Sequence, residues 1–262
     1  MSVEVRNLGV AIGGKPIVRG VDLDIGDSER VGLIGSSGSG KSMISKAMLG
    51  LLPANATAKG SVTLDGTQVV GSPETVLADL RGRYVGVVFQ NPATSLNPVL
   101  TVGKQIELPL KLHYDLDKVD RQERVAAMLG KVGLDEATAR KYPSELSGGQ
   151  QQRVGIATAL ITSPRLIIAD EPTTALDSIT QRQIVDLLVT LVDKAGASML
   201  FITHDFSVLA RATTRCYVLD GGRIIESGKT AELLENPQAG QTKKLVGAAR
   251  ELTLQRKQDR DD

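Results

Sequence analysis

The chain has few of the residues that form covalent crosslinks or metal clusters. Its 262 residues include one cysteine, Cys216, and two histidines, His113 and His204. A single cysteine cannot form an intrachain disulfide, and this set of residues is too small for a zinc cluster. A chain of this length buries enough surface to fold without either. Because Cys216 begins the apolar run Cys216–Leu219, we interpret it as a small core residue rather than a reactive thiol.

Aromatic residues, net charge and long hydrophobic runs are scarce as well. The chain has no tryptophan, 3% aromatic residues and a net charge of +1. It therefore lacks the stacking platforms and the basic surface typical of nucleic-acid partners, and we expect no nucleic acid to bind. Its apolar runs fall far short of the roughly 18 residues that cross a membrane, and no signal-peptide pattern opens the chain. Any function at a membrane would therefore need other subunits to supply the membrane spans.

Short apolar stretches separated by glycine-rich turns dominate the first part of the chain. They predict strands over Val3–Leu8, Ile17–Ile25, Val31–Ile34 and Ser61–Leu64, with turns at Gly13-Gly14 and Asp65-Gly66. Lys41–Leu52 has the pattern of a helix that ends before Pro53.

The rest of the chain has a helical pattern first and then a pattern of alternating helices and strands. Residues Asn91–Leu146 predict a helical insertion, with helices over Val102–Leu112 and Lys118–Gly130. Beyond it we expect alternating helices and strands, over Gly149–Thr162, Arg165–Ala169, Ser178–Lys194, Met199–Thr203 and Cys216–Leu219, and then a charged, solvated tail over Arg250–Asp262. Alternation of this kind predicts an α/β fold with parallel strands and helices on both faces.

A phosphate-binding loop follows the predicted strand Val31–Ile34. Its residues are Gly35, Ser36, Ser37, Gly38, Ser39, Gly40, Lys41 and Ser42, and they match the phosphate-loop pattern at every fixed position. Glycines let backbone amides turn toward an anion, and the start of the following helix adds partial positive charge. Lys41 is expected on the β- and γ-phosphates and Ser42 on Mg²⁺. The loop predicts a nucleoside triphosphate, and it leaves kinases, GTPases and motor ATPases open.

Two acidic residues end a later apolar strand. Asp170 and Glu171 follow Leu166–Ala169 directly. Asp170 can hold Mg²⁺ through water, and Glu171 can orient or deprotonate an attacking water. Two acids after a phosphate loop point to triphosphate hydrolysis.

The segment Leu146–Arg153, which reads LSGGQQQR, is the most specific signal in the chain. With it the sequence resembles the ATP-binding cassette (ABC) family over nearly its whole length. Other family marks appear in order: Gln90 after a strand, Ala175-Leu176-Asp177 after Glu171, and His204 after another strand. The resemblance implies one ABC ATPase domain over 1–262. Its phosphate-loop NTPase (RecA-like) core and antiparallel β subdomain would occupy 1–90 and 160–262, with an inserted helical signature subdomain over 91–159.

The resemblance also implies roles for these residues. ATP bound at Lys41 of one subunit would be capped by the Ser147, Gly148, Gly149 and Gln150 segment of a second, similar subunit, across a dimer contact that includes Asp177. Gln90, together with Ser42 and Asp170, would bind Mg²⁺. Glu171 would be the general base, and His204 would hold the γ-phosphate and orient the water.

Two positions depart from the family pattern. Ile12 stands where cassettes usually stack an aromatic ring on adenine, and Met43 stands where many carry a second hydroxyl. Ile12 can pack on the base only without a π-face, and Met43 can donate to a phosphate only through its backbone N–H. Both residues remain in the predicted nucleotide site.

The segments Gly40–Met43, Leu49–Pro53, Val88–Pro92 and Ser95–Pro98 resemble ATPases of peptide and nickel importers. Chain length and the lack of further cysteines favour the shorter nickel or metal-chelate type slightly over the peptide type. The implied partners are a second, different cassette, two membrane permeases and, indirectly, an extracytoplasmic solute-binding protein. The implied location is the cytoplasmic face of the cell membrane. An exporter ATPase, and a soluble cassette protein acting on DNA or ribosomes, remain as alternatives.

Overall fold

The structure is a computed structural model that describes residues 3–174 and 176–261, with side chains as far as Glu251. The chain forms two compact units, and each is described by itself. The first unit contains the chain up to Pro73 and from Leu200 onward, and the second contains Glu74–Met199. Within the described residues, no helix combines the length and the apolar character that a membrane crossing requires.

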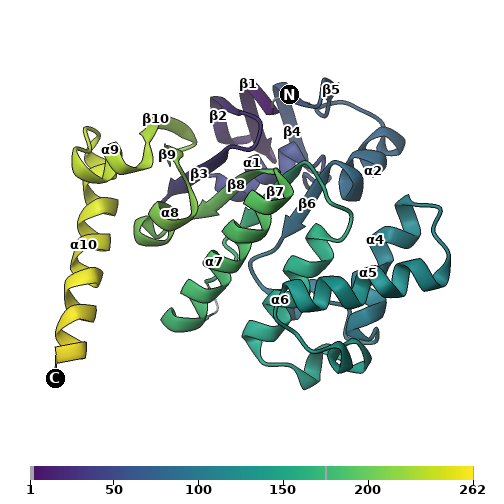
Figure 1. The fold of residues 1–262 in the computed structure, drawn as a ribbon. Coiled ribbons are helices and arrows are strands. Elements are labelled where there is room, and N and C mark those ends of the chain that lie inside the picture. The colour runs from purple at the N-terminus through teal and green to yellow at the C-terminus, as the bar shows by residue number, and fades with distance from the viewer. Residues whose placement is uncertain (1–2, 175, 262) are drawn as a thin grey trace. The chain divides into compact units, whose positions relative to one another are not determined.

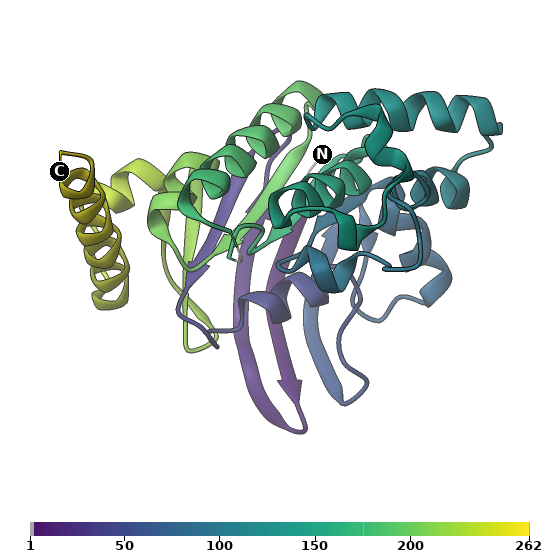
Figure 2. The same cartoon turned by 90° about the horizontal axis from the view of Figure 1, so that it is seen from below.

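An antiparallel sheet with the strand order β2-β1-β4-β5 occupies the amino-terminal part of the first unit. Figure 2 shows its long purple strands side by side. The turns predicted at Gly13-Gly14 and Asp65-Gly66 are confirmed, since all four residues have positive φ, as tight hairpin turns require. The strands are β1 (Val3–Ile12), β2 (Lys15–Ile25), β4 (Ala56–Leu64) and β5 (Thr67–Gln68).

A second group of strands in this unit confirms the predicted parallel pairing. β3 (Arg30–Gly35) pairs parallel with β9 (Arg215–Asp220), and β9 pairs antiparallel with β10 (Arg223–Lys229). β8 (Ser198–Thr203) begins at the end of the second unit and continues into the first. The helices of the first unit are α1 (Lys41–Met48), α8 (Phe206–Ala212), α9 (Thr230–Glu235) and α10 (Gly240–Asp261). Figure 1 labels these elements.

Two predictions about helix ends in this unit are wrong. The helix expected to reach Leu52 ends at Met48, because Gly50 adopts φ +65° and the Leu51 N–H turns back to the Lys46 carbonyl. This is a glycine-dependent helix stop of the Schellman type. The part of the expected charged tail that the structure describes, residues 250–261, belongs to α10, since it contains neither Gly nor Pro and is rich in Leu, Gln and Arg, which favour helix.

Partly exposed charged residues link three segments of the first unit. Arg215 on β9 donates two hydrogen bonds to Glu29 at 2.7 and 2.9 Å and one to Asp24 at 3.0 Å, while the Tyr217 hydroxyl donates to Asp24. The guanidinium holds the pKa of Glu29 below its usual range, chiefly by this hydrogen bonding. Cys216 on β9 is fully buried, as predicted, and burial raises its pKa to about 11.

The second unit combines a parallel strand pair with a group of helices (Figure 1). β6 (Val85–Val88) pairs parallel with β7 (Leu166–Asp170). α6 (Gly148–Leu160) lies directly on β6, since a Cβ on Gly86 would overlap the Ala159 carbonyl oxygen. The other elements are α2 (Glu74–Arg83), α3 (Pro92–Ser95), α4 (Val102–His113), α5 (Lys118–Lys131), η1 (Glu136–Arg140), η2 (Pro143–Glu145), α6 (Gly148–Leu160) and α7 (Ser178–Ala195).

Candidate nucleotide site

The phosphate loop joins β3 to α1, as the sequence predicts. Gly38 and Gly40 have backbone φ angles of +77° and +110°, values that residues other than glycine rarely adopt. A Cβ on Gly35 would overlap the Leu219 carbonyl oxygen, so the loop lies directly on β9. The Ser39 carbonyl accepts the Gly222 N–H at 3.1 Å, which ties the loop to the β9–β10 turn. The loop is thus held in shape by its own unit.

Lys41 is 5% exposed and directs its ammonium group back onto the loop. Its Nζ donates to the carbonyl oxygens of Gly35 at 2.9 Å and Ser36 at 3.1 Å. A buried ammonium requires such acceptors, because charge is costly to remove from water without them. The positive charge of Lys41 therefore lies against the loop that is predicted to bind the phosphates of a nucleotide.

The other predicted residues of the first unit lie at element ends. Ser42 is exposed on the first turn of α1, and Met43 beside it is half-buried. Ile12 is half-buried at the end of β1, beside the hairpin turn. His204 is exposed directly after β8. Their roles toward a nucleotide remain predictions.

In the second unit, the structure brings Gln90 and Glu171 together. Gln90 follows β6, Glu171 follows β7, and parallel strands end at the same edge of a sheet. The Gln90 Nε2 donates to Glu171 Oε2 at 3.1 Å. The Thr174 hydroxyl donates to the same oxygen at 3.0 Å. Glu171 has φ +47°, a left-handed conformation that is uncommon for a residue with a long side chain.

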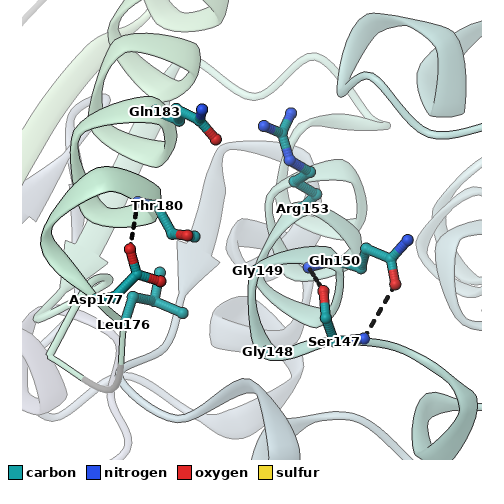
Figure 3. A pocket seen from close by; sticks show the side chains of 9 residues that line it. All are labelled: Ser147, Gly148, Gly149, Gln150, Arg153, Leu176, Asp177, Thr180 and Gln183. Atoms are coloured by element: carbon teal, nitrogen blue, oxygen red, sulfur yellow. Dashed lines mark hydrogen bonds between the residues drawn. The ribbon is translucent and has the colours of Figure 1, made fainter.

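The signature segment LSGGQQQR forms one wall of a pocket of about 360 Å³ (Figure 3). Ser147 caps α6: its Oγ accepts the Gln150 N–H at 3.3 Å, and the Gln150 side chain accepts the Ser147 N–H at 3.0 Å. In this reciprocal cap the Ser147 hydroxyl hydrogen stays available to donate. The pocket is lined by Ser147, Gly148, Gly149, Gln150 and Arg153 from the start of α6, and by Leu176, Asp177, Thr180 and Gln183 from the start of α7 and the residues before it.

The start of α6 gives this pocket the chemistry of an anion site. The first amides of a helix have no acceptors within the helix, and the helix dipole adds partial positive charge. Gly149 lets α6 approach α7 closely in this pocket, because a Cβ there would lie 2.8 Å from Thr180 Cγ2. Arg153 lines the pocket as a cation and also donates to the Val132 carbonyl at 2.6 Å.

Asp177 caps α7 on the other wall of the pocket. Its carboxylate accepts the backbone N–H groups of Ile179 and Thr180, both at 3.0 Å. The hydrogen bond from Thr180 is the main reason why the pKa of Asp177 lies below its usual value. Ala175, which the sequence analysis places with Leu176 and Asp177, lies outside the described residues.

The residues predicted to hold Mg²⁺ offer suitable donors. Ser42, Gln90 and Asp170 provide a hydroxyl, an amide and a carboxylate, which are the oxygen ligands that Mg²⁺ prefers. Within the described parts of the chain, no group of three or more His, Cys, Asp or Glu side chains is placed to hold a metal by itself. Each of the three residues therefore offers an oxygen that suits magnesium, and their joint site stays a prediction.

The sequence analysis missed three residues that the site contains: Thr174, Thr180 and Gln183. Thr174 follows Glu171 by three residues. At this spacing a turn can bring a threonine hydroxyl back to the residue that begins the turn. That spacing was a usable signal. Thr180 and Gln183 belong to α7, and only the packing of α7 beside α6 places them in the pocket.

Comparisons with known proteins identify relatives of this chain. A family model described as ABC transporter matches residues 18–174. The chain is 42% identical over 94% of its length to the peptidoglycan transport ATP-binding protein YejF of Agrobacterium fabrum, and it spans 46% of that protein. It is 42% identical over 87% of its length to a protein of Brucella ovis named for peptide import, and it spans 70% of that protein.

A solved structure confirms the fold prediction. The ATP-binding cassette MJ0796, solved as a dimer in a post-hydrolysis state with ADP and Pi, is similar with a TM-score of 0.78 and 33% identity. The similarity covers 87% of this chain and 98% of that one.

Proposed function

Because the chain belongs to the ABC transporter family, we propose that it binds and hydrolyses ATP as one of two cassettes that drive the import of peptides. The observation that carries the proposal is the meeting of Glu171 with Gln90 at the ends of β7 and β6. A carboxylate held at this edge is suited to accept a proton from a water that attacks the γ-phosphate. The phosphate loop supplies the binding site for the β- and γ-phosphates.

Three side chains take part in the proposed hydrolytic step. The Glu171 carboxylate takes the proton of the attacking water while the bond between the γ-phosphorus and the bridging oxygen breaks, which leaves ADP and phosphate. Lys41 neutralises charge on the phosphates, and His204 orients the water from the γ-phosphate side. A magnesium ion held by Ser42, Gln90 and Asp170 supplies further charge neutralisation when bound.

The signature pocket supports the pairing of two cassettes. Ser147 and the start of α6 line a pocket in the second unit, and the phosphate loop belongs to the first. We assign the pocket to the γ-phosphate of ATP bound by the partner cassette, with Asp177 at the contact between them. Hydrolysis removes that phosphate, and the two subunits separate.

The names of the relatives guide the choice of cargo. Those reported above are named for peptide and peptidoglycan transport. They favour the peptide type over the nickel type that the sequence analysis placed slightly ahead. In this proposal two permeases supply the membrane spans, a solute-binding protein delivers the peptide, and the cassettes bind the permeases at the cytoplasmic face.

Glu171→Gln tests the hydrolytic role. The complex of the variant with its partner cassette and permeases should bind ATP normally and lose turnover by about 10²–10⁴-fold, the usual contribution of a general base. Glu123→Gln, an exposed carboxylate on α5, serves as the matched control. A Glu171→Gln complex that hydrolyses ATP at the parental rate would refute the role.

The direction of transport separates the importer from its alternatives. Permeases should co-purify with the chain. In vesicles with the solute-binding protein on one side of the membrane and ATP on the other, labelled peptide should move from the side of the solute-binding protein to the side of ATP. Export of the peptide, or co-purification with ribosomes or DNA instead of permeases, would contradict the import proposal while leaving hydrolysis intact.

A further inference from the structure

Glu171 is held in place by a second side chain from its own turn. The Thr174 hydroxyl lies 3.0 Å from Glu171 Oε2 and 3.4 Å from the Glu171 carbonyl oxygen. The Thr174 N–H also reaches that carbonyl, at 3.4 Å. One threonine therefore contacts both the carboxylate and the backbone of the predicted general base.

The backbone of Glu171 shows why such support is needed. A residue other than glycine with φ near +47° persists only where its surroundings hold it there. β7 fixes the chain immediately before Glu171, and the Thr174 turn fixes it immediately after. The carboxylate direction is thus set by the turn as well as by its own side-chain torsions.

The two donors on Glu171 share one carboxylate oxygen. Gln90 Nε2 and Thr174 Oγ1 both donate to Oε2, so both residues act on the direction of the same carboxylate. Gln90 is also a proposed ligand of Mg²⁺ through its amide oxygen, and a rotation of its side chain toward the metal would remove its hydrogen bond to Glu171. Thr174 comes from the same turn as Glu171 and can keep its hydrogen bond in both states.

We propose that Thr174 is a positioning residue for ATP hydrolysis, which orients the Glu171 carboxylate toward water when Gln90 leaves it. This inference rests on the proposed hydrolytic function. It predicts a loss in kcat rather than in ATP affinity, because Thr174 acts on the base and not on the nucleotide. Misplacement of a reacting group by about 1 Å costs up to about 10²-fold, and we expect about a tenfold loss because other contacts to Glu171 remain.

The test compares Thr174→Val and Thr174→Ser in the complex with the partner cassette and permeases, with Mg-ATP as substrate. Valine keeps the shape and removes the hydroxyl, and serine keeps the hydroxyl. We expect valine to lower kcat about tenfold with the KM for ATP within about twofold, and serine to retain kcat within about twofold. Thr190→Val, an exposed threonine on α7, is the matched control and should behave as the parent. Thermal unfolding of each variant checks that it folds.

A double variant shows whether Thr174 acts through Glu171. In the Glu171→Gln background, Thr174→Val should cause no further loss in the single-turnover rate, because the base is already absent. An equal tenfold loss in both backgrounds would overturn the proposal, as would a parental kcat for Thr174→Val or a serine variant as slow as the valine one. If the parent complex does not hydrolyse ATP, or if Glu171→Gln is fully active, it is the proposed function that fails.

Discussion

Replacing Gly149 with alanine would place a methyl group inside the signature pocket and change nothing else on α6. The new Cβ would lie 2.8 Å from Thr180 Cγ2, about 0.7 Å closer than the shortest favourable carbon–carbon contact of ~3.5 Å. Thr180 must move or α6 and α7 must separate, and either movement displaces the wall of the anion site. We expect the kcat for ATP of the paired complex to fall about 10–100-fold.

The same substitution should leave the fold intact. Alanine is more favourable than glycine in a helix by about 0.5–1 kcal/mol, and this gain offsets part of the overpacking cost of about 1–3 kcal/mol. Gly155→Ala is the matched control, because it adds the same methyl group to α6 where nothing lies within 4 Å. It should keep parental activity and unfold at the same temperature or slightly higher.

A compensating substitution separates the contact from other effects. Thr180→Ser removes the Cγ2 atom that the new methyl group would meet, so Gly149→Ala combined with Thr180→Ser should recover at least part of the lost kcat. ATP hydrolysis and thermal unfolding are measured on all four proteins of the cycle. Parental hydrolysis by Gly149→Ala, or a double variant no faster than the single one, would refute the contact as the cause.

Three further predictions concern the frame around the site. Cys216, whose pKa burial raises to about 11, should resist thiol reagents at pH 8 until the protein unfolds, and rapid labelling of the native chain would contradict its burial. The pKa of Glu29 is lowered from 4.5 by Arg215, so this pair stabilises the fold above pH 4.5 and the effect is lost as pH falls through the folded pKa. Glu29→Gln should therefore lower the Tm by a few degrees at pH 7 and make the Tm fall less steeply below pH 4.5. A variant whose Tm depends on pH as that of the parent does would count against the pair. Gly86→Ala should destabilise the second unit by about 3 kcal/mol or more in chemical unfolding, since its Cβ would overlap the Ala159 carbonyl oxygen, and a stable variant would show that α6 can move away from β6.

The elements that carry the chemistry could be predicted from the sequence, because each depends on local pattern. The helix predicted over Lys118–Gly130 is observed as Lys118–Lys131, and the strand predicted over Val31–Ile34 as Arg30–Gly35. The phosphate loop was found because its glycines and its lysine have fixed spacings. Local spacing also puts Asp170 and Glu171 at the end of a strand.

Contacts between distant segments could not be predicted in the same way. Gln90 and Glu171 are 81 residues apart, and only the parallel pairing of β6 with β7 brings them together. Thr180 reaches Gly149 because α7 packs beside α6. The edge strand β10 was missed because its burial alternates along a short, polar sequence, Arg223–Lys229, without a continuous apolar run.

The left-handed backbone at residue 171 sets thermal stability against ATP turnover, because a glutamate there strains the backbone while its carboxylate is the proposed general base. Glycine would occupy that conformation without the strain of a Cβ atom, which amounts to about 1–2 kcal/mol. Selection for heat resistance alone would therefore favour loss of the carboxylate, whereas the proposed role of Glu171 as general base predicts that selection for ATP hydrolysis would favour its retention. In an evolution experiment that selects only for heat resistance, variants with glycine at this position should accumulate. They should unfold at a higher temperature and lack ATP hydrolysis.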